Sequence, residues 1–131
     1  MEILSVDTCF LIDLEREQRR EIAGPAEVFL RRHPEAEFCV SVVAFGEYAV
    51  GFDRADHPRL EVIRAGYDIM ASDEETATIY ARIYRTLQEQ RCLIGANDLW
   101  IAAHALQHNV PLVTRNAHEF GHVPGLEVVS Y

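Results

Sequence analysis

The chain has 131 residues, a length that suits one domain over residues 1–131, and 49% of them are hydrophobic. Twenty-one acidic against twelve basic residues give a net charge of −9, which disfavours a protein that coats nucleic acid by bulk electrostatics. No apolar run approaches the roughly 20 residues that span a bilayer, and an acidic residue stands where a signal peptide carries positive charge. We therefore expect a cytoplasmic protein without a membrane segment.

The basic residues are all arginine, because the sequence contains no lysine. This excludes Schiff-base chemistry on a lysine side chain and a phosphate-binding loop of the Walker type. Guanidinium groups suit bidentate contacts to phosphate, although codon usage explains the same bias. The three cysteines, Cys9, Cys39 and Cys92, are odd in number and form no CxxC pair, which disfavours a disulfide framework and a thiolate zinc site.

Apolar runs and helical periodicity divide the chain into alternating strands and helices. In chain order they predict a strand at 3–6, helices at 8–15 and 21–32, a strand at 38–42, helices at 42–52 and 58–67, a strand at 69–70, helices from 72 and from 97, and strands at 110–114 and 127–129. A capping-box pattern in residues 72–75 opens the long helix, and Asn109 is a left-handed stop for the next one. This alternation predicts an α/β fold, a three-layer α/β/α sandwich with a mainly parallel sheet.

Four oxygen-bearing side chains fall at the predicted carboxyl ends of strands, where the active sites of parallel sheets lie. Asp7 closes the first strand, and Glu47 lies about a turn into the helix that follows the second strand. Asp98 begins a helix, and Asn116 follows the last core strand. Asp7 and Asp98 are also suitable helix caps, and Asn116 is a suitable turn residue. Glu47 interrupts an apolar helix, where an unpaired charge is costly.

Three carboxylates brought together repel one another and push at least one toward protonation unless a divalent cation binds them. A hard cation suits an all-oxygen set, and Mg²⁺ binds only one or two carboxylates directly. We therefore expect Asp7 and Asp98 to be direct metal ligands. Glu47 and Asn116 are expected to act through water or to complete a second metal site.

Four segments carry a specific resemblance: VDTCFLID, the isolated Glu of VVAFGEYAVG, IGANDLWIAAHAL and LVTRNAHEFGHVPGL. In this order, and over nearly the whole chain, they resemble the PIN-domain family and within it the VapC-type toxins of toxin–antitoxin pairs. The resemblance implies a Mg²⁺- or Mn²⁺-dependent endoribonuclease that hydrolyses RNA phosphodiester bonds. Asp7, Glu47 and Asp98 match the family's acidic triad, and Asn116 matches a fourth position that is often Asp.

Three neighbouring residues are further candidates. Thr8 and Thr114 are expected to orient Asp7 and the water network, or else to be ordinary capping and strand hydroxyls. Arg115 is expected to hold a substrate phosphate, or else to be a solvated loop residue. The resemblance also implies a homodimer and a cognate antitoxin that blocks the site. The helix at 42–52 agrees with a partner, since it is apolar almost all round and must cover two surfaces.

Two histidine pairs have helical spacing. His104 and His108 are four residues apart, as zinc ligands are, but no Glu lies between them as in HExxH and no cysteine is near. We expect them on the exposed or interfacial side of their helix rather than in a zinc site. His118 and His122 follow Asn116 and are candidates to approach RNA, with nothing in the sequence to choose between them.

Two other functions remain open. One is a different metal-dependent phosphoryl hydrolase, such as a phosphatase of the haloacid dehalogenase type, which also begins with a strand-end Asp. That class needs a DxDx[TV] motif and usually a lysine, whereas Thr8 and Cys9 follow Asp7 here. The other is a non-catalytic PIN-fold assembly module, which the presence of all three acidic residues disfavours.

Overall fold

The computed structural model describes residues 2–131, and in this range the chain forms seven helices and five strands. Their bounds are β1 (Ile3–Val6), α1 (Thr8–Arg20), α2 (Pro25–Arg32), β2 (Glu37–Ser41), α3 (Val42–Ala49), α4 (Pro58–Gly66), β3 (Asp68–Met70), α5 (Glu74–Glu89), α6 (Ala96–His108), β4 (Leu112–Val113), α7 (Ala117–Phe120) and β5 (Val128–Val129). None of the helices in this range has the length and apolarity required to cross a membrane.

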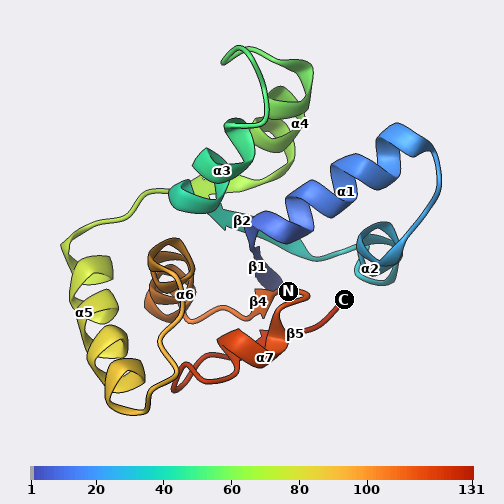
Figure 1. Cartoon of the computed structure of the whole chain (residues 1–131). Coiled ribbons are helices and arrows are strands. Elements are labelled where there is room, and N and C mark those ends of the chain that lie inside the picture. Colours follow the sequence, from blue (N-terminus) through green and yellow to red (C-terminus); the bar gives the residue numbers. More distant parts are fainter. Residues whose placement is uncertain (1) are drawn as a thin grey trace.

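The five strands form one sheet in the order β3-β2-β1-β4-β5, and every pairing between neighbours is parallel. β1 is the central strand, and its Val6 lies opposite Val40 of β2 and Val113 of β4. Helices α1 and α2 lie on one side of the sheet, and α5 and α6 lie on the other (Figure 1). The predicted three-layer sandwich is confirmed, and the carboxyl ends of all strands meet at one edge.

Aromatic packing fixes α1 against the sheet directly after the end of β1. Phe10 is fully buried and packs edge-on against Phe29 of α2, with 6.0 Å between ring centres. It also contacts Phe38 of β2 at 6.5 Å and Tyr131 at 5.0 Å. Burial of a side chain of this size contributes about 1.5–3 kcal/mol. The first turn of α1, which carries the predicted site residues, is therefore held by the core.

The boundary between the first two helices differs from the prediction of helices at 8–15 and 21–32. α1 continues to Arg20 and ends at Glu21, which has a left-handed backbone conformation (φ 55°). α2 starts only at Pro25, and the carboxylate of Glu17 accepts hydrogen bonds from three backbone N–H groups at its start. The charged stretch of α1 is therefore helical and supplies the side chain that caps the next helix.

Smaller differences concern the ends of elements. The capping box of α5 is built from Asp73 and Thr76, one residue later than the predicted pattern. The last core strand covers two residues of the predicted 110–114 segment, and the short helix α7 follows it where a loop was expected. Asn109 ends α6 in a left-handed conformation (φ 52°), as predicted.

His104 and His108 were expected on the exposed or interfacial side of their helix, but His104 is buried within the chain. α5 covers this side of α6, as the stacking of Tyr80 on Trp100 at 4.3 Å illustrates. The His104 side chain is fully buried, and neither of its ring nitrogens has a hydrogen-bond partner within residues 2–131. Burial, with a smaller contribution from His108, lowers the pKa of His104 to about 4, so the ring is neutral at physiological pH.

Candidate active site

Asp7 follows the central strand, and its side chain is only 3% exposed. Its Oδ1 accepts hydrogen bonds from the Phe10 backbone N–H (3.1 Å) and from Cys9 Sγ (2.8 Å), and its Oδ2 accepts one from the Thr114 hydroxyl. Burial raises the pKa of Asp7, whereas these hydrogen bonds and the charge of Arg115 oppose that shift. Asp7 therefore caps α1, and Thr114 from the end of β4 fixes its orientation.

Glu47 lies on α3 and joins the first turns of two other helices. Its Oε1 accepts a hydrogen bond from the Thr8 hydroxyl at 2.6 Å, and its Oε2 accepts one from Asn97 Nδ2 at 3.0 Å. Thr8 thus orients Glu47 and not Asp7, which corrects the expectation from the sequence. Asn97 was not among the predicted site residues, although its place beside Asp98 at a helix start was a usable signal.

Asp98 lies in the first turn of α6, and its pKa is raised to about 6. Burial is the largest cause, followed by the charges of Glu47, Asp7 and Glu119. The structure thus places Glu47 and Asp7 close enough to disfavour the ionised form of Asp98, in line with the expected repulsion. Residues 92–95 before α6 form a loop rather than a strand, so Asp98 reaches this edge from a helix start.

Asn116, which precedes α7, and Glu119 of α7 lie next to the acidic residues. The backbone N–H of Asn116 donates to the Thr114 hydroxyl at 2.9 Å, so Thr114 links Asn116 to Asp7. The Asn116 side chain is exposed and makes no hydrogen bond within residues 2–131. Glu119 was missed from the sequence because the helix α7 was not predicted. With that helix, its position three residues after Asn116 would have indicated the same edge.

Arg115 is paired with an acidic side chain in this structure, and its expected contact with a substrate phosphate stays a prediction. Its NH1 group forms an ion pair with both oxygens of Asp13, at 2.8 and 2.9 Å. The Tyr131 hydroxyl donates to Asp13 Oδ2 at 2.8 Å and lies 3.4 Å from Cys9 Sγ, which itself contacts Asp7. Asp13 therefore holds Arg115, and Tyr131 links Asp13 to Cys9. These residues are distant in sequence, and no local pattern predicts their contacts.

The residues present fit a hard divalent cation. Their ligand atoms are carboxylate and amide oxygens, and the raised pKa of Asp98 reflects an excess of negative charge that a cation would offset. Within residues 2–131, no three His, Cys, Asp or Glu side chains form a ready-made metal cluster.

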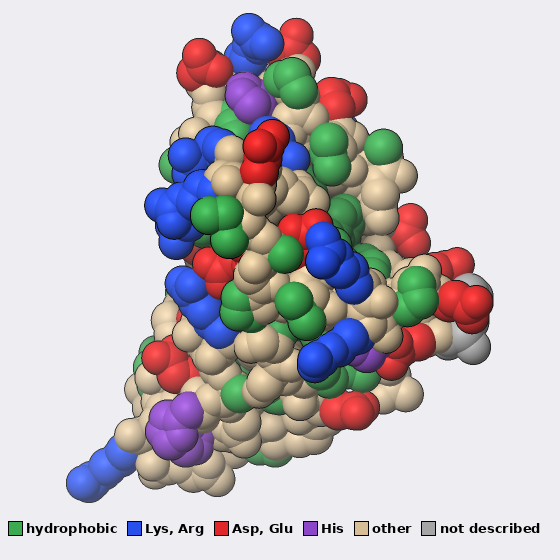
Figure 2. All heavy atoms as spheres, turned by 90° about the vertical axis from the view of Figure 1, so that its right-hand side faces the viewer, with side chains coloured by type: hydrophobic (Ala, Val, Ile, Leu, Met, Phe, Trp, Pro, Cys, Tyr) green, Lys and Arg blue, Asp and Glu red, His purple; other side chains and the backbone are tan. Residues whose placement is uncertain are grey.

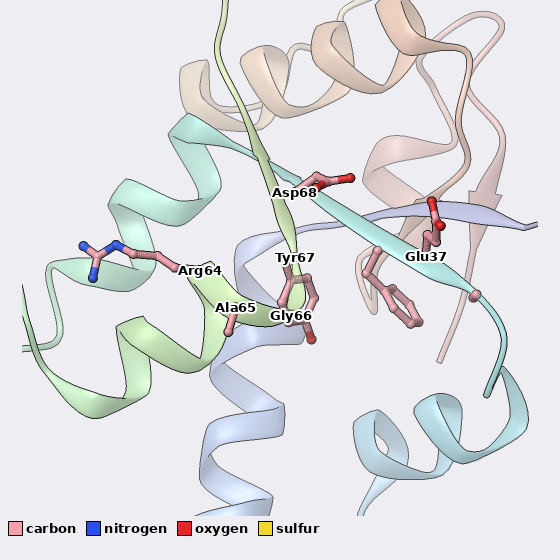
Figure 3. Close-up of a pocket in the computed structure, with 8 residues that line it drawn as sticks. Glu37, Arg64, Ala65, Gly66, Tyr67 and Asp68 are labelled. Carbon is pink, nitrogen blue, oxygen red and sulfur yellow. The ribbon is translucent and has the colours of Figure 1, made fainter.

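A cavity of about 340 Å³ is lined by residues such as Glu37, Arg64 and Asp68 (Figure 3). Glu37 and Asp68 are the first residues of β2 and β3, so this cavity lies at the amino ends of the strands. Asp7 follows the carboxyl end of β1, so the cavity is separate from the acidic residues.

Arginine side chains do not form a continuous basic surface on the face seen in Figure 2, because acidic side chains lie among them. Several arginines are paired on their own helices. Arg19 contacts Glu15 on α1 at 3.2 Å, and Arg31 contacts Glu27 on α2 at 3.1 Å. Both pairs lie near the surface, where their mutual attraction is weak but their charges cancel.

The PIN-domain sequence profile matches residues 4–126, and the chain therefore belongs to the PIN-domain family. Among its relatives, "Ribonuclease VapC1" of Rickettsia felis is 30% identical over 135 residues, covering 97% of this chain and 95% of that protein. Within the PIN-domain family the chain is thus of the VapC type.

Solved structures agree with this assignment. VapBC2 from Rickettsia felis, bound to a DNA fragment from its promoter, has a TM-score of 0.81 at 21% identity and covers 98% of each chain. VapBC-1 from nontypeable Haemophilus influenzae has a TM-score of 0.75 at 25% identity, covering 98% of this chain and 97% of that one. The first of these likenesses concerns the fold alone.

Proposed function

We propose that the protein is a divalent-metal-dependent endoribonuclease that hydrolyses RNA phosphodiester bonds, as the toxin of a type II toxin–antitoxin pair. The observation that carries this proposal is that Glu47 accepts hydrogen bonds both from Thr8, next to Asp7, and from Asn97, next to Asp98. Relatives of the chain that bear the name ribonuclease VapC support the choice of RNA as substrate.

In this proposal Asp7 and Asp98 hold Mg²⁺ or Mn²⁺ directly, and Glu47 and Asn116 act through water. When bound, such an ion supplies Lewis-acid activation of water and of a phosphate oxygen. The chain's own contribution is orientation: Thr114 holds one oxygen of Asp7, and the α1 backbone holds the other. Because both contacts are already formed, little reorganisation of Asp7 is needed when RNA binds.

The test is cleavage of a set of single-stranded and hairpin RNAs by the purified, untagged protein with Mg²⁺ or Mn²⁺. We expect internal cleavage with either ion and none after chelation with EDTA, and no cleavage of DNA of matched sequence. Turnover of a small phosphomonoester without RNA cleavage would identify a phosphatase instead. Absence of divalent-metal binding in calorimetry would favour a non-catalytic assembly module. Growth arrest on induced expression, absent in Asp98→Asn, is expected if the nuclease is a toxin.

The proposed partners follow from the same assignment. A similar solved structure from Klebsiella pneumoniae is a toxin–antitoxin complex, and we propose a cognate antitoxin that blocks the acidic edge in the cytoplasm. A basic antitoxin segment would complement the net charge of −9 and the acidic site. Co-purification of the wild-type chain with the product of an adjacent small reading frame tests this, and relief of growth arrest by that product is the expected result.

We also propose a homodimer through α3. Val42 and Val50 are 43% and 85% exposed, and they lie four residues before and after Gly46, so the three share one side of the helix. A Cβ added at Gly46 would meet nothing within 4 Å, so this side is open in the single chain. An exposed apolar stripe of this kind marks an interface.

Val50→Arg is expected to convert the dimer to a monomer, because it places a charge in an apolar interface. Sedimentation equilibrium measures the change in mass. Val62→Arg is the matched control, since Val62 on α4 is also exposed, at 49%, and lies outside this stripe. A dimer that survives Val50→Arg but dissociates in Val62→Arg would contradict the proposed interface.

A further inference from the structure

His118 and His122 form an exposed pair directly after the acidic edge. Their ring centres are 5.1 Å apart, and the ring planes are inclined by 79°. Both residues are exposed, and neither imidazole makes a hydrogen bond to any residue in the range 2–131. Unlike His57, whose Nδ1 accepts the backbone N–H of Arg59, this pair has all its ring nitrogens available to a ligand.

The backbone holds the pair in place. α7 continues as a series of turns, with Gly121 N–H bonded to Ala117 at 2.8 Å and His122 N–H bonded to Glu119 at 3.3 Å. Phe120 is fully buried and Val123 is 2% exposed, so both anchor this segment in the core. His118 and His122 therefore lie on one side of a short turn whose opposite side is fixed.

The separation of the rings fits a shared metal ion. Zinc lies about 2.0–2.1 Å from an imidazole nitrogen, and two imidazoles on one tetrahedral ion then have ring centres about 5 Å apart. The observed 5.1 Å matches this separation, so rotation of the exposed rings can bring one nitrogen of each to a shared ion. His104 and His108 have a similar separation of 4.7 Å, but His104 is fully buried and cannot receive a hydrated ion from solvent.

The surrounding charge also favours a cation. Glu119 follows His118 directly, and its charge acts on Asp98 together with those of Glu47 and Asp7. Imidazole selects borderline metals such as Zn²⁺, Ni²⁺ and Cu²⁺, whereas carboxylates and water suit Mg²⁺ and Mn²⁺. The two imidazoles and the neighbouring carboxylates therefore suit different metal ions.

We propose that His118 and His122 together bind a transition-metal ion of the Zn²⁺, Ni²⁺ or Cu²⁺ class at the rim of the acidic edge. Two protein ligands leave the other positions of the ion to water or to an anionic oxygen, such as that of a phosphate. The site is separate from the proposed nuclease metal and does not require it.

The test is titration of the untagged protein with Ni²⁺ and with Zn²⁺ in excess Mg²⁺, followed by calorimetry and by NMR of the imidazole side chains. We expect one ion per chain and shifts confined to His118 and His122. Loss of a residue that hydrogen-bonds to a metal ligand weakens metal binding roughly 10–100-fold. His122→Gln removes a proposed ligand itself and should weaken binding at least as much. His57→Gln is the matched control and should bind as the wild type does.

The Asp98→Asn variant tests whether the histidine pair binds an ion independently of the acidic residues. Binding of Ni²⁺ that persists in Asp98→Asn and is lost in His122→Gln supports the histidine pair, whether or not the protein cleaves RNA. Equal binding by His122→Gln and the wild type, or no binding by the wild type, would overturn the proposal. Because His122 is exposed and makes no side-chain hydrogen bond, an unchanged circular dichroism spectrum is expected for its variant.

Discussion

Asp98→Asn is expected to stabilise the metal-free protein near neutral pH by about 1 kcal/mol, since solvent screens the charges around this half-buried carboxyl, and to lower RNA cleavage roughly 100-fold or more. The pKa of Asp98 is raised to about 6 in the folded chain, above the value of the unfolded chain. The contribution of Asp98 to stability therefore falls as the pH rises from about 4 to 6, and its full penalty of ionisation applies above that range. The neutral amide removes the penalty, and it also removes a proposed metal ligand.

Chemical denaturation in EDTA measures the first effect, and RNA cleavage in Mg²⁺ measures the second. Added Mg²⁺ should stabilise the wild type and leave Asp98→Asn unchanged, since only an ion that prefers the folded chain raises its stability. Asp53→Asn removes the same charge from an exposed loop residue between α3 and α4, and should change neither property. An Asp98→Asn variant that is less stable than the wild type in EDTA would contradict this account.

Asp7→Asn and Asp7→Ala are expected to abolish cleavage equally but to differ in stability. Asp7→Asn keeps an oxygen that accepts the Phe10 backbone N–H, so the cap of α1 survives. Asp7→Ala removes the cap and leaves the buried Thr114 hydroxyl without this partner. Loss of a cap costs about 0.5–2 kcal/mol and a buried unpaired polar group about 1–3 kcal/mol.

Thermal and denaturant unfolding of the two variants measure this difference, and RNA cleavage under saturating Mn²⁺ measures activity. We expect Asp7→Ala to unfold at lower denaturant than Asp7→Asn, with both inactive. If Asp7→Asn retained full cleavage, the carboxylate would not be a metal ligand and its function would be confined to capping. The pair of variants thus tests the two interpretations that the sequence left open for this residue.

Much of the fold was predictable because apolar periodicity and strand ends are local properties of the chain. Asp7 and Asn116 lie beside the predicted strand ends, and the parallel arrangement then brings them to one edge. The expected repulsion among the acids also appears, in the raised pKa of Asp98. The roles proposed for these residues in metal binding remain predictions.

The features that the sequence did not reveal depend on tertiary contacts. Glu17 caps α2 across a turn, which extends α1 beyond its apolar pattern. α5 covers His104, so a polar residue that looked exposed is buried. Arg115 has a partner in Asp13, more than one hundred residues earlier in the chain. Each of these contacts joins segments that are brought together by packing, so no short stretch of sequence predicts it.

The position of Asp7 after the central strand has a consequence for control of the activity. β1 is hydrogen-bonded along both its edges, and strands of this kind open only when the whole domain unfolds. Local unfolding of peripheral segments therefore leaves Asp7 in place, so partial unfolding would not inactivate the proposed nuclease. Under the proposed function, the activity would have to be restrained by a separate molecule that occupies the acidic edge.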